Sequence, residues 1–373
     1  MARTVIASSA QQTKKKWAGA LFHSSVPTSY FGSRFMAEGS GDNAPNAPIH
    51  LVTDLESDSG DEVNFDIYAQ LTGTPTFGDD SLEGDEESLT PFSDKVVINQ
   101  VRKATDSGGK MTRKRTPNDH RMICRNKLTD WWSRFIDEAV FMNIAGARGT
   151  NADYIMPVGS TYAIDGQSLV SRTSDKIVYA GSATSKASLT SSDTFGYSAI
   201  DKAVTKAETE GGGSDGKIRL TPMRIDGVDK FVCVMHNYQE HSLRTSTGTG
   251  QFLDIQKAAA TNNGSKNAIF TGALGEYRGV VLHKHNKVTQ FNDYGAGSNL
   301  AASRALFLGR QALVAAFGSP SNSGLRYDWT EEWKDYKNRL GIATACVLGM
   351  KRPQFNGEDV NSLVIDSYAA KPY

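Results

Sequence analysis

This sequence has few of the features that mark a secreted protein, a membrane-spanning protein or a protein that binds DNA through an excess of basic residues. It has three cysteines in 373 residues, far apart and odd in number, which argues against a disulfide framework or a metal-binding spacing and favours a reducing compartment. No apolar stretch precedes the lysines at 14–16, so we expect no secretory signal. No apolar run approaches the roughly 20 residues that a membrane span needs, so we expect a soluble chain without membrane contact.

A surplus of basic residues is also absent. Lys+Arg and Asp+Glu both total 41, and a net charge of zero argues against a protein that binds nucleic acid by neutralising phosphates. The balance is not local, because residues 51–94 hold thirteen acids and no base, whereas residues 95–134 hold eleven bases and three acids. Six of the acids lie within 78–92: Asp79, Asp80, Glu83, Asp85, Glu86 and Glu87. Since no base lies nearby in the sequence, we expect the partner of this acidic stretch to lie elsewhere.

The N-terminal third is expected to contain an arm and a long hairpin. Residues 1–50 are rich in small and polar residues, carry scattered aromatics and show no helical period, which predicts an extended arm lying along a surface. Alternating apolar residues predict a strand at 61–72, and a second strand follows at 95–104. The two strands predict a long ribbon with an acidic tip. Because such a ribbon is marginal alone in water and has two open edges, we expect another surface to support it.

A long helix is expected next. The residues TPND predict its start, with Thr116 as cap and Pro117 in the first turn. Apolar residues then recur at steps of three and four until Gly146, which predicts a helix over 116–144.

The rest of the chain mixes strand and helix signals. We expect helical segments at 199–210, 238–245, 252–261 and 330–339, strands at 218–225, 231–237, 277–285 and 363–368, and buried runs at 305–317 and 342–350. Because the order shows no regular βαβ repeat, the expected fold class is α+β.

Two catalytic or phosphate-binding motifs are nearly matched by GGGSDGK at 211–217. The spacing resembles a phosphate loop, but Ile218 replaces the Ser or Thr that would hold magnesium. Ser214 has the flanking glycines of a nucleophile elbow, but the stretch follows a predicted helix rather than a strand. A connecting loop is therefore favoured.

Metal sites are not favoured either. His283 and His285 lie on one face of a predicted strand, but no cysteine or acid completes a ligand set, so a surface pair of histidines is favoured. The acidic stretch does not match the spacing of a calcium loop. We expect no catalytic residue, no metal and no cofactor.

Several separated blocks resemble one known family. These blocks are LEGDEESL (82–89), VVINQVRKA (96–104), GGKMTRKRT (108–116), LTDWW (128–132), 218–245 and 267–285. They resemble the major capsid proteins of tailed bacteriophages, in particular the branch typified by coliphage N-four, which share the Hong Kong 97-type shell fold. The resemblance covers most of residues 50–370.

The resemblance implies a domain organisation. It implies an N-terminal arm (1–50), an extended β-hairpin E-loop (51–108), a peripheral domain (109–195) with a spine helix at 116–144, an axial domain (196–320) and a C-terminal return to the peripheral domain (321–373).

It also implies a function and partners. The chain would assemble with itself into hexamers and pentamers of a virion capsid in the cytoplasm of a bacterial host. It would need a separate scaffolding protein, join a portal, accept a decoration protein, and enclose double-stranded DNA without sequence-specific binding. The six acids of the tip would lie on bases of a neighbouring subunit, for which we expect Arg113, Arg115, Arg121 and Arg125. The alternatives are another self-assembling shell or tail protein and a serine hydrolase that uses Ser214.

Overall fold

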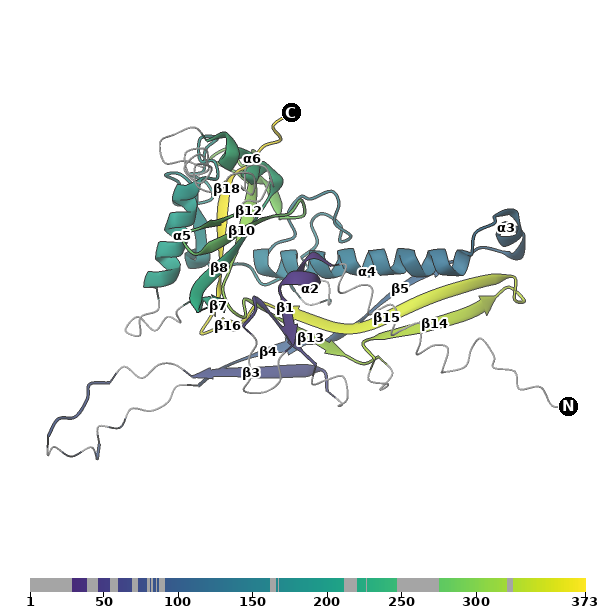
Figure 1. The fold of residues 1–373 in the computed structure, drawn as a ribbon, viewed down its shortest axis with the longest axis horizontal. Helices are drawn as coiled ribbons and strands as arrows, with labels where there is room; N and C mark the ends of the chain where they lie inside the picture. Colours follow the sequence, from purple (N-terminus) through teal and green to yellow (C-terminus); the bar gives the residue numbers. More distant parts are fainter. Residues whose placement is uncertain are drawn as a thin grey trace.

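The computed structural model describes most of the chain and shows a mixed α and β protein built around two sheets (Figure 1). The described residues are 29–38, 46–53, 60–68, 73–78, 81, 83–84, 86, 91–161, 166, 168–210, 220–225, 227–246, 275–320 and 325–373. The expected α+β class is confirmed. Within these residues, no helix is both long and apolar enough to cross a membrane.

One long helix, α4 (His120–Ala145), runs along the molecule and is the element that sequence periodicity predicts best. Its 26 residues span about 39 Å at ~1.5 Å per residue. It ends where predicted, since Gly146 adopts φ 67° and donates its N–H to Met142 O. The predicted start is wrong, because Asp119 is the N-cap and accepts from Arg121 N. Thr116 instead ends a separate short helix, α3 (Lys110–Arg115).

The first sheet lies beside α4 and is elongated. Its order is β1-β2-β13-β15-β14, with β5 on the other edge of β15. The bounds are β1 Met36–Glu38, β2 Ile49–Val52, β5 Asn99–Asp106, β13 Leu313–Gly318, β14 Tyr327–Lys334 and β15 Arg339–Lys351. The expected helix at 330–339 is wrong, because its first half belongs to β14, which pairs with β15 along eight residues. The buried run at 342–350 is the middle of β15.

The second sheet lies near the C-terminal end of α4 (Figure 1). Its order is β6-β18-β12-β8-β10-β9, with β11 on β12 and β7 on β8. The bounds are β6 Ile177–Tyr179, β7 Met223–Ile225, β8 Val228–Met235, β9 Glu276–Tyr277, β10 Val280–Lys284, β11 Gln290–Tyr294, β12 Leu300–Leu308 and β18 Ser362–Tyr368. Helices α5 (Tyr197–Thr209) and α6 (Asn237–Thr245) pack beside it, and η2 (Ser174–Lys176) precedes β6. A small hairpin, β16 (Gln354–Phe355) with β17 (Glu358–Asp359), joins the two sheets along the chain.

Two hydrophobic cores explain why this second sheet is buried on both faces. One face, which includes Val232, Val234 and Leu306, shares a core with α4 and the first sheet. The opposite face packs against α5. Successive residues of a strand point to opposite faces, so the continuous apolar runs of β8 and β12 fit a sheet covered on both sides.

The arm predicted over 1–50 is partly folded into the body. Residues 1–28 lie outside the described part, but α2 (Tyr30–Arg34), β1 and β2 do not form an extended arm. Strand β2 pairs in parallel with β13, and Phe31 and Ile49 are fully buried. Asp137 on α4 holds this segment, because its carboxylate accepts from Ser29 Oγ (2.8 Å) and from the backbone N–H of Phe31 (3.1 Å).

The predicted hairpin exists, with shorter strands. Strand β3 (Glu62–Tyr68) pairs with β4 (Pro91–Val97) as a separate two-stranded ribbon. The second predicted strand, 95–104, breaks at Ile98, after which the chain enters β5 and the first sheet. In Figure 1 the ribbon runs away from α4, and the described loop residues 73–78 lie past its end.

Sheet membership does not follow chain order. Strand β13 lies within 196–320 but belongs to the first sheet, whereas β6 lies within 109–195 but belongs to the second. The end of the chain also returns to the second sheet, because β18 pairs with β12 and β6. The chain therefore crosses between the sheets several times.

Candidate functional site

The base of the β3–β4 ribbon is attached to its own chain, contrary to part of the sequence expectation. Lys95 Nζ lies 2.8 Å from Glu62, and Asp94 is paired with Lys351. Asp94 also accepts from Gln354 N at 2.9 Å. Two of the thirteen acids in 51–94 therefore have partners in the same chain. The ribbon is fixed at its base, and only its outer part lacks support from the described body.

The outer loop carries the acidic stretch. Glu83 and Glu86 are exposed, and Gly84 N donates to Glu86 at 2.9 Å. Within the described residues, neither carboxylate makes an ion pair. Four predicted contact residues lie outside the described part: Asp79, Asp80, Asp85 and Glu87. The same loop exposes a large apolar side chain, Phe77, which is 75% accessible to solvent.

The four predicted arginines lie together around α3 and the start of α4, but two of them are held by the chain itself. Arg121 pairs with Glu331 at 2.7 Å, and Arg113 donates to Asn338 O at 3.1 Å while its guanidinium lies 5.0 Å from the Trp333 ring centroid. Arg125 is half-buried, whereas Arg115 is exposed. Sequence reasoning missed these contacts because Glu331 and Trp333 were assigned to a helix.

Exposed bases adjoin the held arginines. Lys110, Lys114 and Arg115 are all exposed on α3, which carries no acidic residue. Among the predicted set, Arg115 is therefore the most accessible base, and its lysine neighbours extend the same positive surface.

The acidic loop and the basic helix do not meet within one chain. In Figure 1, α3 stands at one end of the molecule's longest axis and the loop residues 73–78 stand at the other. The base of the ribbon is fixed to β15 and β16, because Asp94 accepts from Lys351 Nζ and from Gln354 N. The described loop residues therefore lie apart from α3 of the same copy.

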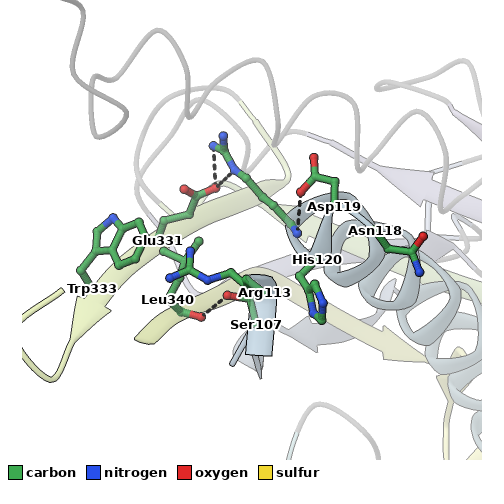
Figure 2. A pocket seen from close by; sticks show the side chains of 9 residues that line it. Ser107, Arg113, Asn118, Asp119, His120, Glu331, Trp333 and Leu340 are labelled. Carbon is green, nitrogen blue, oxygen red and sulfur yellow. Dashed lines mark hydrogen bonds and ion pairs between the residues drawn. The ribbon is translucent and has the colours of Figure 1, made fainter. Parts of the chain in front are cut away.

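A pocket lies beside α3. It has a volume of about 300 Å³. Its lining comes from the β5–α3 connection, α3, the start of α4, β14 and β15: Ser107, Arg113, Asn118, Asp119, His120, Arg121, Glu331, Trp333 and Leu340. Figure 2 shows Arg113 beside the strand residues Glu331, Trp333 and Leu340. Trp333 remains 42% exposed, so the pocket offers an open aromatic surface.

A buried ionic network holds the C-terminal end of α4, and no sequence signal pointed to it. Arg304 makes two hydrogen bonds of 2.8 Å with Asp366 and donates to Ala145 O. Arg352 contacts Asp359 at 2.6 Å and donates to Asn143 O. These arginines satisfy carbonyls at the negative end of the helix dipole.

The pKa values in this network follow its charges. Arg172 belongs to the same network, since its Nε lies 3.3 Å from Asp359. Burial, together with the neighbouring Arg352, lowers the pKa of Arg172 to about 9. Burial opposes ionisation of Asp359, but Arg172 and Arg352 outweigh it and hold the pKa of that carboxyl below its ordinary value. The network joins β12 and β18 of the second sheet, and the connection that follows β15, to the end of α4.

The histidine pair does not lie on the open surface as expected. His283 and His285 are half-buried beneath the α2 segment, with ring centroids of Phe35 and Tyr30 at 5.2 Å and 4.5 Å respectively. Burial lowers the pKa of His285 to about 4, and burial likewise lowers the pKa of His236 to about 4. The motif at 211–217, including Ser214, lies outside the described residues.

Stability should therefore fall as the pH falls from about 6.5 to 4. In this window the unfolded chain protonates these histidines and the folded chain does not, so folding is favoured above pH 6.5 and the advantage is lost toward pH 4. We expect His285→Phe, which keeps an aromatic ring against Phe141, to remove up to one proton, or about 1.4 kcal/mol per pH unit, from this dependence. Urea unfolding of the unassembled chain at pH 7, 6 and 5 measures it. An unchanged slope in the variant would show that His285 does not contribute.

The comparisons with known proteins agree with one another. A family model described as phage capsid protein matches residues 4–371. The major capsid protein of Pseudomonas phage KPP25 is 26% identical over 352 residues, which cover 87% of this chain and 88% of that protein. The capsid structure of Ralstonia phage GP4 is 44% identical, covers 100% of both chains and superposes with a TM-score of 0.81. The capsid of cyanophage Pam1 shares the fold, with a TM-score of 0.72 at 18% identity over 92% of this chain and 93% of that one.

Proposed function

This chain belongs to the phage capsid protein family and is a major capsid protein that forms the icosahedral shell of a tailed phage, and we propose that it does so as hexamers and pentamers that enclose double-stranded DNA. Its fold is the Hong Kong 97-type shell fold. The observation that carries the function is the family match over residues 4–371, together with full-length similarity to a phage capsid. The membership of the coliphage N-four branch is part of the proposal and rests on the sequence blocks given above.

In the proposed arrangement, the loop between β3 and β4 lies on a neighbouring copy. Two observations support this. The described loop residues Glu83 and Glu86 expose carboxylates without an ion pair in the described chain, and α3 exposes Lys114 and Arg115 at the far end of the molecule. Surface pairs of this kind contribute only ~0–1 kcal/mol each. Their value lies in selecting the partner and its register, and in repetition at every copy of the shell.

We assign the family's domains to the two sheets. The ribbon β3–β4 with its loop is the E-loop, and α4 is the spine helix. The unit of α4 and the first sheet is the peripheral domain, and the unit of the second sheet with α5 and α6 is the axial domain. This assignment follows the sheet pairing in place of the continuous segments expected from the sequence.

Further partners and properties belong to the same proposal. A separate scaffolding protein, a portal and a decoration protein would join the shell, which would assemble in the cytoplasm of the bacterial host. A net charge of zero is compatible with a lining that does not grip DNA as it enters. The family is structural, and we propose that the chain catalyses no reaction.

Electron microscopy of the purified protein tests the function. The chain, produced alone or with other head proteins of its phage, should form closed shells of icosahedral outline. Open tubes would favour a tail protein. Small particles with esterase activity that is lost in Ser214→Ala would favour the hydrolase.

The E-loop should not form a covalent cross-link between copies. Some members of this fold join a loop lysine to an asparagine of a neighbour, but no lysine lies between Lys16 and Lys95 in this sequence. The loop between β3 and β4 therefore has no amine to react, and Lys95 lies at the base of the ribbon, paired with Glu62. Shells boiled in detergent should run as a single band near 40.4 kDa. A ladder of covalent oligomers under reducing conditions would contradict this prediction.

A further inference from the structure

Two aromatic side chains are exposed at opposite ends of the molecule, and the charge attraction between copies gives them no role. The acidic loop exposes Phe77, which is 75% accessible although its neighbour Thr76 is half-buried. The pocket beside α3 exposes Trp333. Large exposed aromatic side chains frequently mark contact sites between proteins.

We propose that Phe77 of one copy inserts into the pocket beside Trp333 of the neighbouring copy, where it acts as the apolar anchor of the loop contact. This inference rests on the proposed function, because it names the residue and the pocket through which copies join. It adds a specific, desolvated contact to the diffuse charge attraction described above.

The chemistry of the pocket fits an aromatic side chain with acidic neighbours. Trp333 and Leu340 supply apolar surface, and a volume of about 300 Å³ leaves room for a single ring. Buried aromatic pairs add to the burial of their area by packing edge to face or offset. The exposed bases of α3 can pair with the carboxylates that follow Phe77 in the loop; these bases are Lys110, Lys114 and Arg115.

Arg113, which donates to Asn338 O, has a second donor that is not used within the described part of the chain. Its Nε is buried and, among the residues that the structure describes, has no hydrogen-bond partner. A buried donor without an acceptor is unfavourable, so an acceptor from outside the chain would stabilise this position. A backbone carbonyl or a carboxylate of the incoming loop is such an acceptor. Figure 2 shows Arg113 among the residues that line the pocket.

The positions of the inserting loop and of the receiving pocket specify the kind of assembly. The loop and α3, which helps to line the pocket, lie at opposite ends of the longest axis, so the contact is head to tail. A head-to-tail contact uses different surfaces on the two copies and closes into a ring when the rotation between copies allows it. Hexamers and pentamers are such rings, so one contact serves both.

Footprinting of the unaltered chain gives the first test. Hydroxyl-radical oxidation, read by mass spectrometry, should fall severalfold at both Phe77 and Trp333 when the chain assembles. In Phe77→Ala, the head-to-tail association should weaken roughly thirtyfold, which corresponds to about 2 kcal/mol. Unchanged oxidation of Trp333 on assembly would overturn the inference.

A cysteine pair tests the geometry without removing either ring. The three native cysteines are buried, so background disulfides are low. Shells that mix a Thr76→Cys copy with an Asn118→Cys copy should give disulfide-linked dimers on oxidation, and shells of either variant alone should not. As a matched control, Thr76→Cys mixed with Val158→Cys, at a site 65% exposed, should give none.

The outcomes separate the two proposals. Shells that form normally but lack either the Trp333 protection or the 76–118 disulfide would overturn this inference and leave the capsid function intact. Failure of the unaltered chain to form shells, alone or with other head proteins of its phage, would instead overturn the proposed function.

Discussion

Replacing three loop carboxylates by lysine, as Glu83→Lys, Glu86→Lys and Glu87→Lys, is expected to abolish shell formation at low salt. The described carboxylates of this set are exposed and make no ion pair within the described chain, so the change should leave the fold of each copy intact. The triple change makes the charge of the loop more positive by six units and sets it opposite the positive surface of a neighbouring α3. Like charges across an interface oppose the correct register more strongly than lost attraction does.

The structure also selects the compensating change. Sequence reasoning would reverse Arg121 and Arg125, but Arg121 holds Glu331 within its own chain, so its reversal would damage the copy that carries it. Lys114→Glu and Arg115→Glu are the better choice because both side chains are exposed. This pair of changes should restore shells to the triple variant. Glutamine at the three loop positions is the matched control and should give an intermediate yield.

The measurement is shell yield by sedimentation at low and high salt. Salt should partly rescue the triple lysine variant because it screens exposed charges. Equal yields and equal salt sensitivity for the unaltered and the reversed chain would show that the loop carboxylates do not contribute to assembly.

The second large effect concerns the buried network at the end of α4. Asp366→Asn should destabilise the unassembled chain by about 3–5 kcal/mol, because it leaves the buried Arg304 guanidinium without its counter-charge. The same substitution disturbs Tyr294, whose hydroxyl donates to Asp366 at 2.6 Å. Because Arg304 also donates to Ala145 O, a variant that still folds should hold the end of α4 less firmly against the second sheet.

Urea unfolding of the unassembled chain measures this effect. Asp130→Asn is the matched control, since Asp130 forms an exposed pair with Lys127 at 3.7 Å and should leave the unfolding midpoint unchanged. A midpoint for Asp366→Asn equal to that of the control would show that the buried network does not stabilise the fold.

The elements that the sequence predicts well are those whose apolar residues recur at regular local spacing. The helix α4 and the ribbon strands β3 and β4 have regular apolar spacing, and Gly146 ends α4 as its conformational freedom allows. Strand β14 also carried a signal, because Tyr327, Trp329 and Trp333 recur at even spacing. Its many charged residues concealed that alternation and suggested a helix.

The features that the sequence does not predict depend on long-range pairing. Strand β18 joins the second sheet, and Arg352 reaches a carbonyl of Asn143 that lies 209 residues away in the chain. Arginine is usually a surface residue, so the presence of arginines in a sequence does not by itself indicate a buried network. The predicted contact residues stay a prediction for the same reason. The four arginines form one positive region, but the contact of Arg121 with Glu331 follows from the pairing of β14, which the sequence did not predict.

A cryo-electron microscopy map of the assembled shell shows whether the β3–β4 loop joins one copy to the next. We expect density for the loop against α3 and the start of α4 of an adjacent copy, with Phe77 beside that copy's Trp333 and the loop carboxylates near its Lys114 and Arg115. A loop that folds back on its own chain, or extends into solvent without touching a neighbour, would show that it does not join the copies.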